Sequence, residues 1–142
     1  MLTPQDTGAR AKHLKPSITL TASDHERLSG LVRAAMNNMP DVASGLADEI
    51  DRAYIVAKGQ HPIGVVSMGS EVKFRDDTSG RIQKVFLVYP NQADISQDKI
   101  SVLTPIGTAL IGLRVGSSIT WETRTGEFKR LTVLEVRETE LA

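Results

Sequence analysis

The chain has 142 residues, of which 40% are hydrophobic, so it can form one compact domain or a small domain with an appendage. Its 17 basic and 17 acidic residues cancel, which argues against nucleic acid as the main ligand. The absence of cysteine excludes disulfides and cysteine-ligated metals and fits a reducing cytoplasm, and no apolar run approaches the ~20 residues of a membrane span.

The two ends of the chain carry little pattern. Residues 1–17 include Pro4, Gly8 and Pro16 and no apolar stretch long enough for a secretory signal, so we expect a mobile tail, with a second short tail at 139–142. The first tail is also basic. A solvated terminus is the simpler expectation, although these basic residues can contact an acidic partner surface: Arg10, Lys12, His13 and Lys15.

A helical hairpin is predicted over residues 18–59, and its first arm follows Ile18 to Leu20. Either Thr21 with Asp24 or Ser23 with Glu26 supplies the N-cap and acid spacing that opens a helix. An apolar stripe then recurs at the helical period: Leu28, Leu31, Val32 and Ala35. A turn ends this arm because proline and asparagine disfavour its continuation: Asn37, Asn38, Met39 and Pro40.

The second arm is expected to start with Asp41 as its cap and to stop at Lys58-Gly59. Its apolar face comprises Leu46, Ile50, Ala53, Tyr54 and Ala57, and its polar face comprises Asp48, Glu49, Asp51 and Arg52. Each arm holds roughly 16 residues and so measures about 24 Å at about 1.5 Å per residue. Two such stripes joined by a tight turn make a short antiparallel coiled coil.

Residues 60–64 are a linker by composition, and an α+β domain is predicted over 65–138. Its first hairpin joins strands at 72–75 and 81–89 through a turn at 76–80. Further strands are expected at 99–103, 118–123 and 128–136, with a turn at 124–127 between the last two. The sheet is expected to be antiparallel with one short helix against it, and Trp121 is expected to pack into the core.

The segment 104–119 supplies that short helix. Thr104 is placed to cap it, Pro105 suits the first helical position, and Gly112 permits the left-handed conformation that ends helices. A turn at 116–118 then leads into the next strand.

Catalytic patterns are missing from the sequence. The three histidines, His13, His25 and His61, fall in the tail, the first helix and the linker without metal-ligand spacing. No glycine-rich segment carries the lysine of a phosphate-binding loop. The sequence therefore predicts no enzyme activity, no cofactor and no metal.

Three ordered blocks carry a resemblance to a known family: residues 65–74, 86–94 and 100–112. They are similar to the C-terminal domain of the bacterial Gre transcript-cleavage factors, and the resemblance covers roughly Ile18 to Glu138. The short arms, together with Val88-Tyr89-Pro90 and the segments 112–116 and 119–122, resemble a branch of this family whose name implies regulation of nucleoside diphosphate kinase. The resemblance implies an FKBP-like fold for residues 65–138.

The resemblance also implies a partner. In Gre factors the loop before the short helix contacts the coiled coil at the rim of the RNA polymerase secondary channel. The residues that match this loop are Leu103, Thr104, Pro105 and Ile106, with Leu103 standing where the cleavage factors often have an acidic residue. We expect apolar contact through an exposed Pro-Ile edge, DNA contact only through the polymerase, no membrane contact and a monomeric protein.

The hairpin tip departs from the cleavage factors, whose longer coiled coil carries two acidic residues that help to hold a catalytic magnesium ion. Here the tip comprises Asn37, Asn38, Met39 and Asp41, with a single carboxylate. The sequence therefore predicts a regulator of transcription elongation that competes with Gre factors without stimulating RNA cleavage. Two alternatives stay open: a cleavage cofactor that uses Asp41 with Asp48 or Glu49, and a module that binds nucleoside diphosphate kinase directly.

Overall fold

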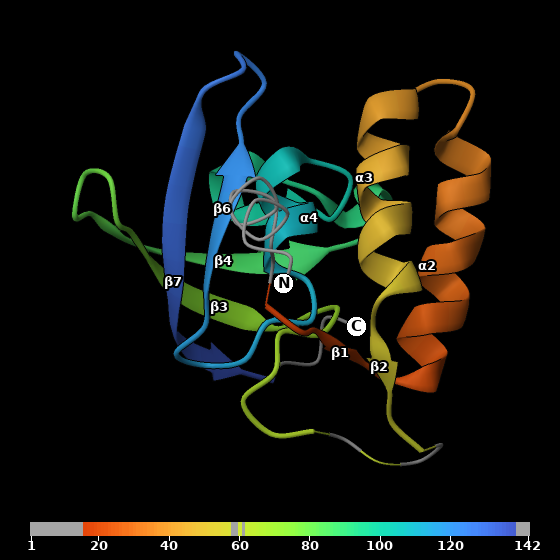
Figure 1. Ribbon diagram of the computed structural model, residues 1–142, viewed down its shortest axis with the longest axis horizontal. Helices are drawn as coiled ribbons and strands as arrows, with labels where there is room; N and C mark the ends of the chain where they lie inside the picture. Colours follow the sequence, from red (N-terminus) through yellow and green to blue (C-terminus); the bar gives the residue numbers. More distant parts are fainter. Residues whose placement is uncertain (1–15, 58–59, 61, 139–142) are drawn as a thin grey trace, which may run out of the picture.

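A helical hairpin stands beside a curved five-stranded sheet in the computed structural model (Figure 1), which describes residues 16–57, 60 and 62–138. The tail predicted at 139–142 lies outside the described residues, as does all of the tail at 1–17 except Pro16 and Ser17. The helix end expected at Lys58-Gly59 also lies outside them. Within the described part of the chain, no helix is long and apolar enough to cross a membrane.

The first arm of the hairpin is α2, Ala22–Ala35. Thr21 is its N-cap, because the Thr21 hydroxyl accepts a hydrogen bond from the Asp24 backbone N–H at 3.0 Å. This geometry decides between the two cap pairs that the sequence allowed. Three members of the predicted apolar stripe are buried, namely Leu28, Val32 and Ala35, and Leu31 packs against them.

The second arm, α3, runs over Pro40–Asp51, and both of its ends differ from the prediction. Met39 occupies the N-cap position without a side-chain hydrogen bond, so Asp41 is not the cap. Because proline fits the first helical position without needing a donor, the helix starts at Pro40 and places Asp41 in the first turn, where its charge complements the helix dipole.

The end of α3 comes several residues earlier than predicted. Tyr54–Ile55 forms strand β2, which pairs in parallel with β1, Thr19–Leu20, so this backbone leaves the helix to bond with the incoming chain. Tyr54 is consequently 68% exposed instead of lying on the apolar helix face. At about 1.5 Å per residue, the arms of 14 and 12 residues measure about 21 Å and about 18 Å.

The polar face of α3 also differs from the prediction at Glu49. This residue is 1% exposed, and one carboxylate oxygen lies 2.5 Å from an Arg52 guanidinium nitrogen. Burial is tolerated because the carboxylate is paired with a cation one turn further along the same helix.

The five strands of the sheet confirm the predicted set: β3 (Glu71–Asp76), β4 (Ile82–Val88), β5 (Lys99–Ser101), β6 (Ser118–Glu122) and β7 (Phe128–Arg137). They lie in the order β5-β4-β3-β7-β6. One pairing corrects the expectation of a wholly antiparallel sheet, because β4 and β5 are parallel. Two 3-10 turns, Pro90–Gln92 and Ile95–Gln97, bring the chain back along β4 before β5 begins.

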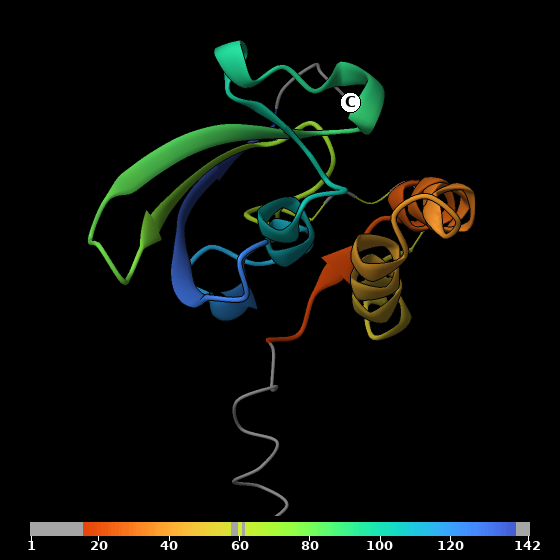
Figure 2. The same ribbon diagram turned by 90° about the horizontal axis from the view of Figure 1, so that it is seen from above.

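The short helix α4, Pro105–Leu110, lies between β6 and α3 (Figure 2). Thr104 caps it as predicted, accepting from the Gly107 N–H at 3.0 Å, and Pro105 stands at the first helical position. The chain then turns at Gly112, whose φ is +80°.

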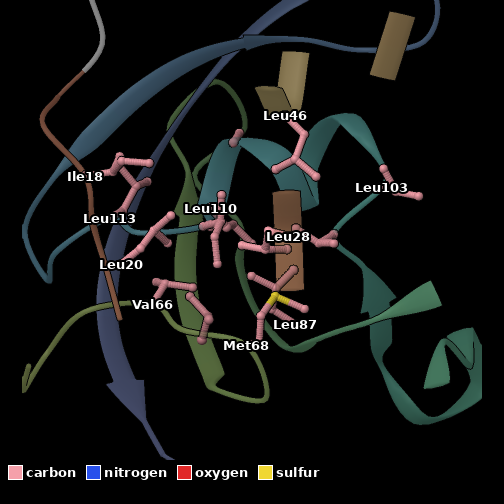
Figure 3. Close-up of a cluster of buried hydrophobic side chains, with 14 of the residues drawn as sticks. Ile18, Leu20, Leu28, Leu46, Val66, Met68, Leu87, Leu103, Leu110 and Leu113 are labelled. Atoms are coloured by element: carbon pink, nitrogen blue, oxygen red, sulfur yellow. The ribbon is translucent and has the colours of Figure 1, made fainter. Parts of the chain in front are cut away.

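A single buried cluster joins the hairpin to the sheet (Figure 3). Leu28 and Leu46 from the hairpin pack in the same cluster as Leu87 and Leu110. A polar contact supports this junction, because the Asp24 carboxylate accepts from the Met68 N–H at 3.1 Å. The hairpin is therefore held against the sheet by side chains on both sides of residues 60–64, and the domain boundary there stays a prediction.

Candidate functional site: the loop before α4 and two clefts beside it

The loop before α4 is fixed by its own hydrogen bonds. The Leu103 N–H donates to the Ser101 hydroxyl at 2.9 Å, and the Thr104 hydroxyl donates to the Ser101 carbonyl at 2.7 Å. A Cβ added at Gly107 would lie 2.2 Å from that same carbonyl oxygen, so only glycine allows the helix to start this close to β5. These hydrogen bonds and the close packing at Gly107 therefore fix the conformation of the loop.

The structure separates the four residues predicted to form the site. Leu103 is 6% exposed and belongs to the core, so it supports the loop from beneath instead of presenting an apolar contact. It follows β5 and the buried Val102, so two successive side chains enter the core here. Thr104, Pro105 and Ile106 are half-buried and form the accessible edge.

An apolar cleft of about 570 Å³ opens on one side of this edge. We call it the apolar cleft, and its main apolar lining residues are Ile95, Ile100, Pro105, Ile106 and Trp121. Ile95 is 81% exposed, and the cations Lys99 and Arg124 also border the cleft. A groove of this kind offers an apolar contact with a basic rim.

A second cleft of about 520 Å³ lies on the other side of Pro105, against the hairpin. We call it the hairpin cleft. It is bordered by α3 (Asp41, Val42, Gly45), by α4 (Pro105, Thr108, Ala109) and by the end of β6 with the following turn (Trp121, Glu122, Thr123, Arg124, Gly126). Pro105, Trp121, Thr123 and Arg124 border both clefts.

Sequence reasoning missed several residues of these clefts. Ile95 is a lone apolar residue in a polar segment, and only the 3-10 turn before β5 places it beside Ile106. Trp121, predicted as a core residue, does pack against the core but is only partly buried and lines both clefts. The only signal in the sequence was an isoleucine between the polar residues Asp94 and Ser96.

The residues of the predicted hairpin tip do lie together, at the end where α2 turns into α3. All of them are exposed: Asn37, Asn38, Met39 and Asp41. Asp48 and Glu49 are not brought to this tip, because seven and eight residues along α3 place them about 11 Å and about 12 Å from Asp41 along the axis. Within the residues that the structure describes, no group of three or more histidine, aspartate or glutamate side chains is placed to hold a metal ion.

Comparison with known proteins gives the class of the molecule. The family model of the transcription elongation factor GreA/GreB C-terminal domain matches residues 60–138, and the Rnk N-terminus model matches residues 16–56. A solved GreA/GreB elongation factor from Nitrosomonas europaea has a TM-score of 0.68 and 37% identity, covering 87% of this chain and 99% of that one. The chain belongs to the GreA/GreB family.

Among the relatives in this family, some are named as regulators and others as elongation factors. The regulator of nucleoside diphosphate kinase from Escherichia coli (strain K12) is 40% identical over 123 residues, which are 86% of this chain and 90% of the relative. Transcription elongation factor GreA from Chloroflexus aggregans is 38% identical over 88 residues, which are 62% of this chain and 55% of that factor. The relatives are named as regulators and elongation factors, and this chain is a GreA/GreB-like regulator by its family.

Proposed function

We propose that the protein regulates transcription elongation by binding RNA polymerase at the rim of its secondary channel through residues 104–106 and the apolar cleft. The observation that carries this proposal is the rigid Pro105–Ile106 edge beside an apolar cleft of about 570 Å³. By resemblance, this edge matches the loop through which Gre factors contact the polymerase, and the chain belongs to that family.

The chemistry of the edge suits a helical partner surface. Pro105 is already rigid, so contact with it costs little conformational entropy. Ile95 and Ile106 provide apolar area, while Lys99 and Arg124 can pair with acidic residues at the rim. With Leu103 buried beneath the loop, this contact rests on apolar packing where the cleavage factors often place a carboxylate.

The hairpin supports competition without RNA cleavage. Its arms of about 21 Å and about 18 Å are short, and Asp41 is the only carboxylate at the tip. Hard Mg²⁺ favours several oxygen ligands, and phosphoryl transfer gains from a second metal held by paired carboxylates. Glu49, buried against Arg52, is placed as a structural residue and not as a ligand at the tip.

A transcript-cleavage assay on backtracked RNA polymerase tests the activity. We expect no shortening of the RNA by this protein alone, and less shortening by GreA when this protein is in excess. Shortened RNA in the presence of this protein alone would instead favour the alternative of a cleavage cofactor.

A binding measurement with the same polymerase tests the site. Ile95→Ser is expected to weaken binding about tenfold or more, since it removes an apolar side chain worth about 1.5–3 kcal/mol when buried. Ile63→Ser is the matched control, because Ile63 is 94% exposed and borders neither cleft. If the two variants bound RNA polymerase with equal affinity, the apolar cleft would not be the binding site.

A second candidate function follows from the relative named as a regulator of nucleoside diphosphate kinase. In this case the protein would bind the kinase directly. Affinity capture from a mixture of purified kinase and polymerase separates the two functions. Retention of the kinase without polymerase would select the second.

A further inference from the structure

We propose that the hairpin cleft and the free edge of β6 together bind an extended peptide segment of a partner protein, which adds to the sheet as a further strand next to β6. This surface adjoins the apolar cleft, because Pro105, Trp121, Thr123 and Arg124 border both. It gives the molecule a second binding mode beside the proposed polymerase contact.

The hydrogen bonds of β6 show which of its backbone groups are available. β6 is the last strand of the sheet, and its register pairs Ile119 with Leu131 and Trp121 with Lys129 of β7. The flanking bonds, from the Thr123 N–H to the Glu127 carbonyl at 2.8 Å and from the Val133 N–H to the Ser117 carbonyl at 2.9 Å, show that the odd-numbered residues bond to β7.

The N–H and C=O groups of the even-numbered residues therefore point away from β7. These residues are Ser118, Thr120 and Glu122, and their backbone groups have no backbone partner among the residues that the structure describes. They span roughly 13 Å, at about 3.3 Å per residue. Such a row recognises the alternating donors and acceptors of an extended polypeptide.

The hairpin cleft begins where this edge meets the β6–β7 turn. Glu122 borders the cleft from the sheet, Val42 and Gly45 border it from α3, and Ala109 borders it from α4. An added strand would lie about 4.8 Å from β6. Residues of α3 border the cleft opposite β6, so a strand added at this edge would lie between β6 and α3.

The cleft also indicates which side chains the partner carries. Val42, Pro105 and Ala109 present an apolar surface, so alternate side chains of the added strand that face α4 should be small and apolar. Two carboxylates, Asp41 and Glu122, border the cleft together with one guanidinium, Arg124. The excess of negative charge favours a basic residue in the peptide.

Gly45 provides a precise way to close the cleft. It lies within α3 and borders the cleft, and a Cβ built there meets nothing within 4 Å, so a side chain can start from this position without a clash. Replacing glycine in a helix also improves helix propensity by up to about 1 kcal/mol, so the variant should fold. Gly30 in α2 is the matched control, since its added Cβ meets only the end of Arg33 at 3.7 Å and it borders neither cleft.

The experiment uses the full chain and a random-peptide display library to select probes. The selected peptides are synthesised with a fluorescent label, and their affinities are measured by anisotropy. We expect sequences in which small apolar residues alternate and at least one basic residue occurs. Gly45→Leu should weaken binding about tenfold or more, while Gly30→Leu should leave it unchanged.

A backbone test separates strand addition from simple occupation of the cleft. Two probes are made, one N-methylated at the odd-numbered amides and one at the even-numbered amides, and only one of them should lose binding. Thr120→Pro should also weaken binding, without breaking a bond to β7. The proposal would be overturned if no peptide were selected or if the probe bound wild type and Gly45→Leu equally. It would also be overturned if both N-methylated probes bound as tightly as the unmethylated probe. Full displacement of the probe by a peptide of residues 1–15 would assign the cleft to the chain's own N-terminal segment and overturn it as well.

Discussion

At Gly112 the chain passes from α4 toward β6 with a positive φ of +80° and in close contact with β1. A Cβ added there would lie 2.6 Å from the Cβ of Ile18, which is buried in the shared core. The Thr19 N–H also donates to the Gly112 carbonyl at 3.0 Å. Both the backbone conformation and the space therefore require glycine at this position.

We predict that Gly112→Ala lowers the free energy of unfolding by about 2–4 kcal/mol, from backbone strain of about 1 kcal/mol and overpacking of about 1–3 kcal/mol. Gly116→Ala is the control, since Gly116 has a φ of +91° with nothing within 4 Å of its added Cβ. It should lose only about 1 kcal/mol. Urea unfolding measures both, and equal losses would show that the contact with Ile18 has no cost.

The ion pair between Glu49 and Arg52 leads to a second prediction. Arg52 donates to the Glu49 carboxylate and to the Pro16 carbonyl, so it joins α3 to the chain that precedes β1. Because Glu49 is 1% exposed, Arg52→Ala removes a partner from a buried charge and should cost about 1–3 kcal/mol.

Arg33→Ala, on the exposed face of α2, is the control for the loss of an arginine from this hairpin and should change stability by less than about 0.5 kcal/mol. Thermal unfolding of the two variants makes the comparison. A similar midpoint for both would contradict the structural role of Arg52.

These residue-scale features differ in how far the sequence predicts them. The caps Thr21 and Thr104 follow from local spacing, because the bond that each makes lies within three residues. The burial of Glu49 and Leu103 does not, since it depends on which elements pack over them. A carboxylate on the polar face of a helix and a residue of a predicted contact loop are both expected to be exposed, and tertiary packing buries both here.

At the scale of elements, the junction of α2 with the end of β4 has an unusual aromatic residue. Tyr89 is 8% exposed, and the Arg27 guanidinium lies 4.3 Å from its ring centroid. Its hydroxyl has no hydrogen-bond partner among the described residues. Burial, and then the Asp24 carboxylate, raise the pKa of Tyr89 to about 12, while Arg27 acts in the opposite direction.

We predict that Tyr89→Phe is neutral or stabilises the protein near pH 7, by up to about 1 kcal/mol, because it removes a buried hydroxyl without a partner. At high pH the variants should diverge. The folded state holds the phenolic proton to a higher pH than the unfolded state, so wild-type stability is lost as the pH rises from about 10 to about 12. Tyr89→Phe has no phenol at this position, so it does not show this loss of stability at high pH.

Urea unfolding at a series of alkaline pH values measures the difference between the two proteins. All other residues are common to both proteins, so their contributions cancel in the comparison. A difference that stays constant from pH 8 to pH 11 would contradict the raised pKa of Tyr89.

Element type was predictable wherever a periodic pattern runs for several residues. The five strands and the two arms follow from alternation and from helical stripes. The parallel pairing of β4 with β5 was not predictable, because the two 3-10 turns that reverse the chain carry no pattern of their own. The pairing of β1 with β2 involves two residues of each strand, which is too short to give a strand pattern in the sequence. The predicted second helix therefore ran on through Tyr54.

For the whole molecule, one buried cluster holds side chains of both the hairpin and the sheet. The side chains of Leu28, Leu46, Leu87 and Leu110 are 0% exposed in the same cluster, although two belong to the hairpin and two to the sheet domain (Figure 3). The composition of residues 60–64 indicates a linker, but it does not indicate how the segments before and after the linker pack against each other. The sequence therefore predicted two segments without predicting their contact.

The final prediction is that the hairpin and the sheet unfold together. The chain has a single tryptophan, Trp121 on β6, so its fluorescence reports on the sheet, while circular dichroism at the helical bands reports mainly on the hairpin. In urea the two signals should give one midpoint.

Leu28→Ala should lower the free energy of unfolding by about 2–5 kcal/mol and move both signals together, although Leu28 lies in the hairpin. Ala34→Gly, at an exposed position of the same helix, should cost only about 1 kcal/mol. Two separate midpoints, or a Trp121 transition unaffected by Leu28→Ala, would mean that the sheet folds without the hairpin.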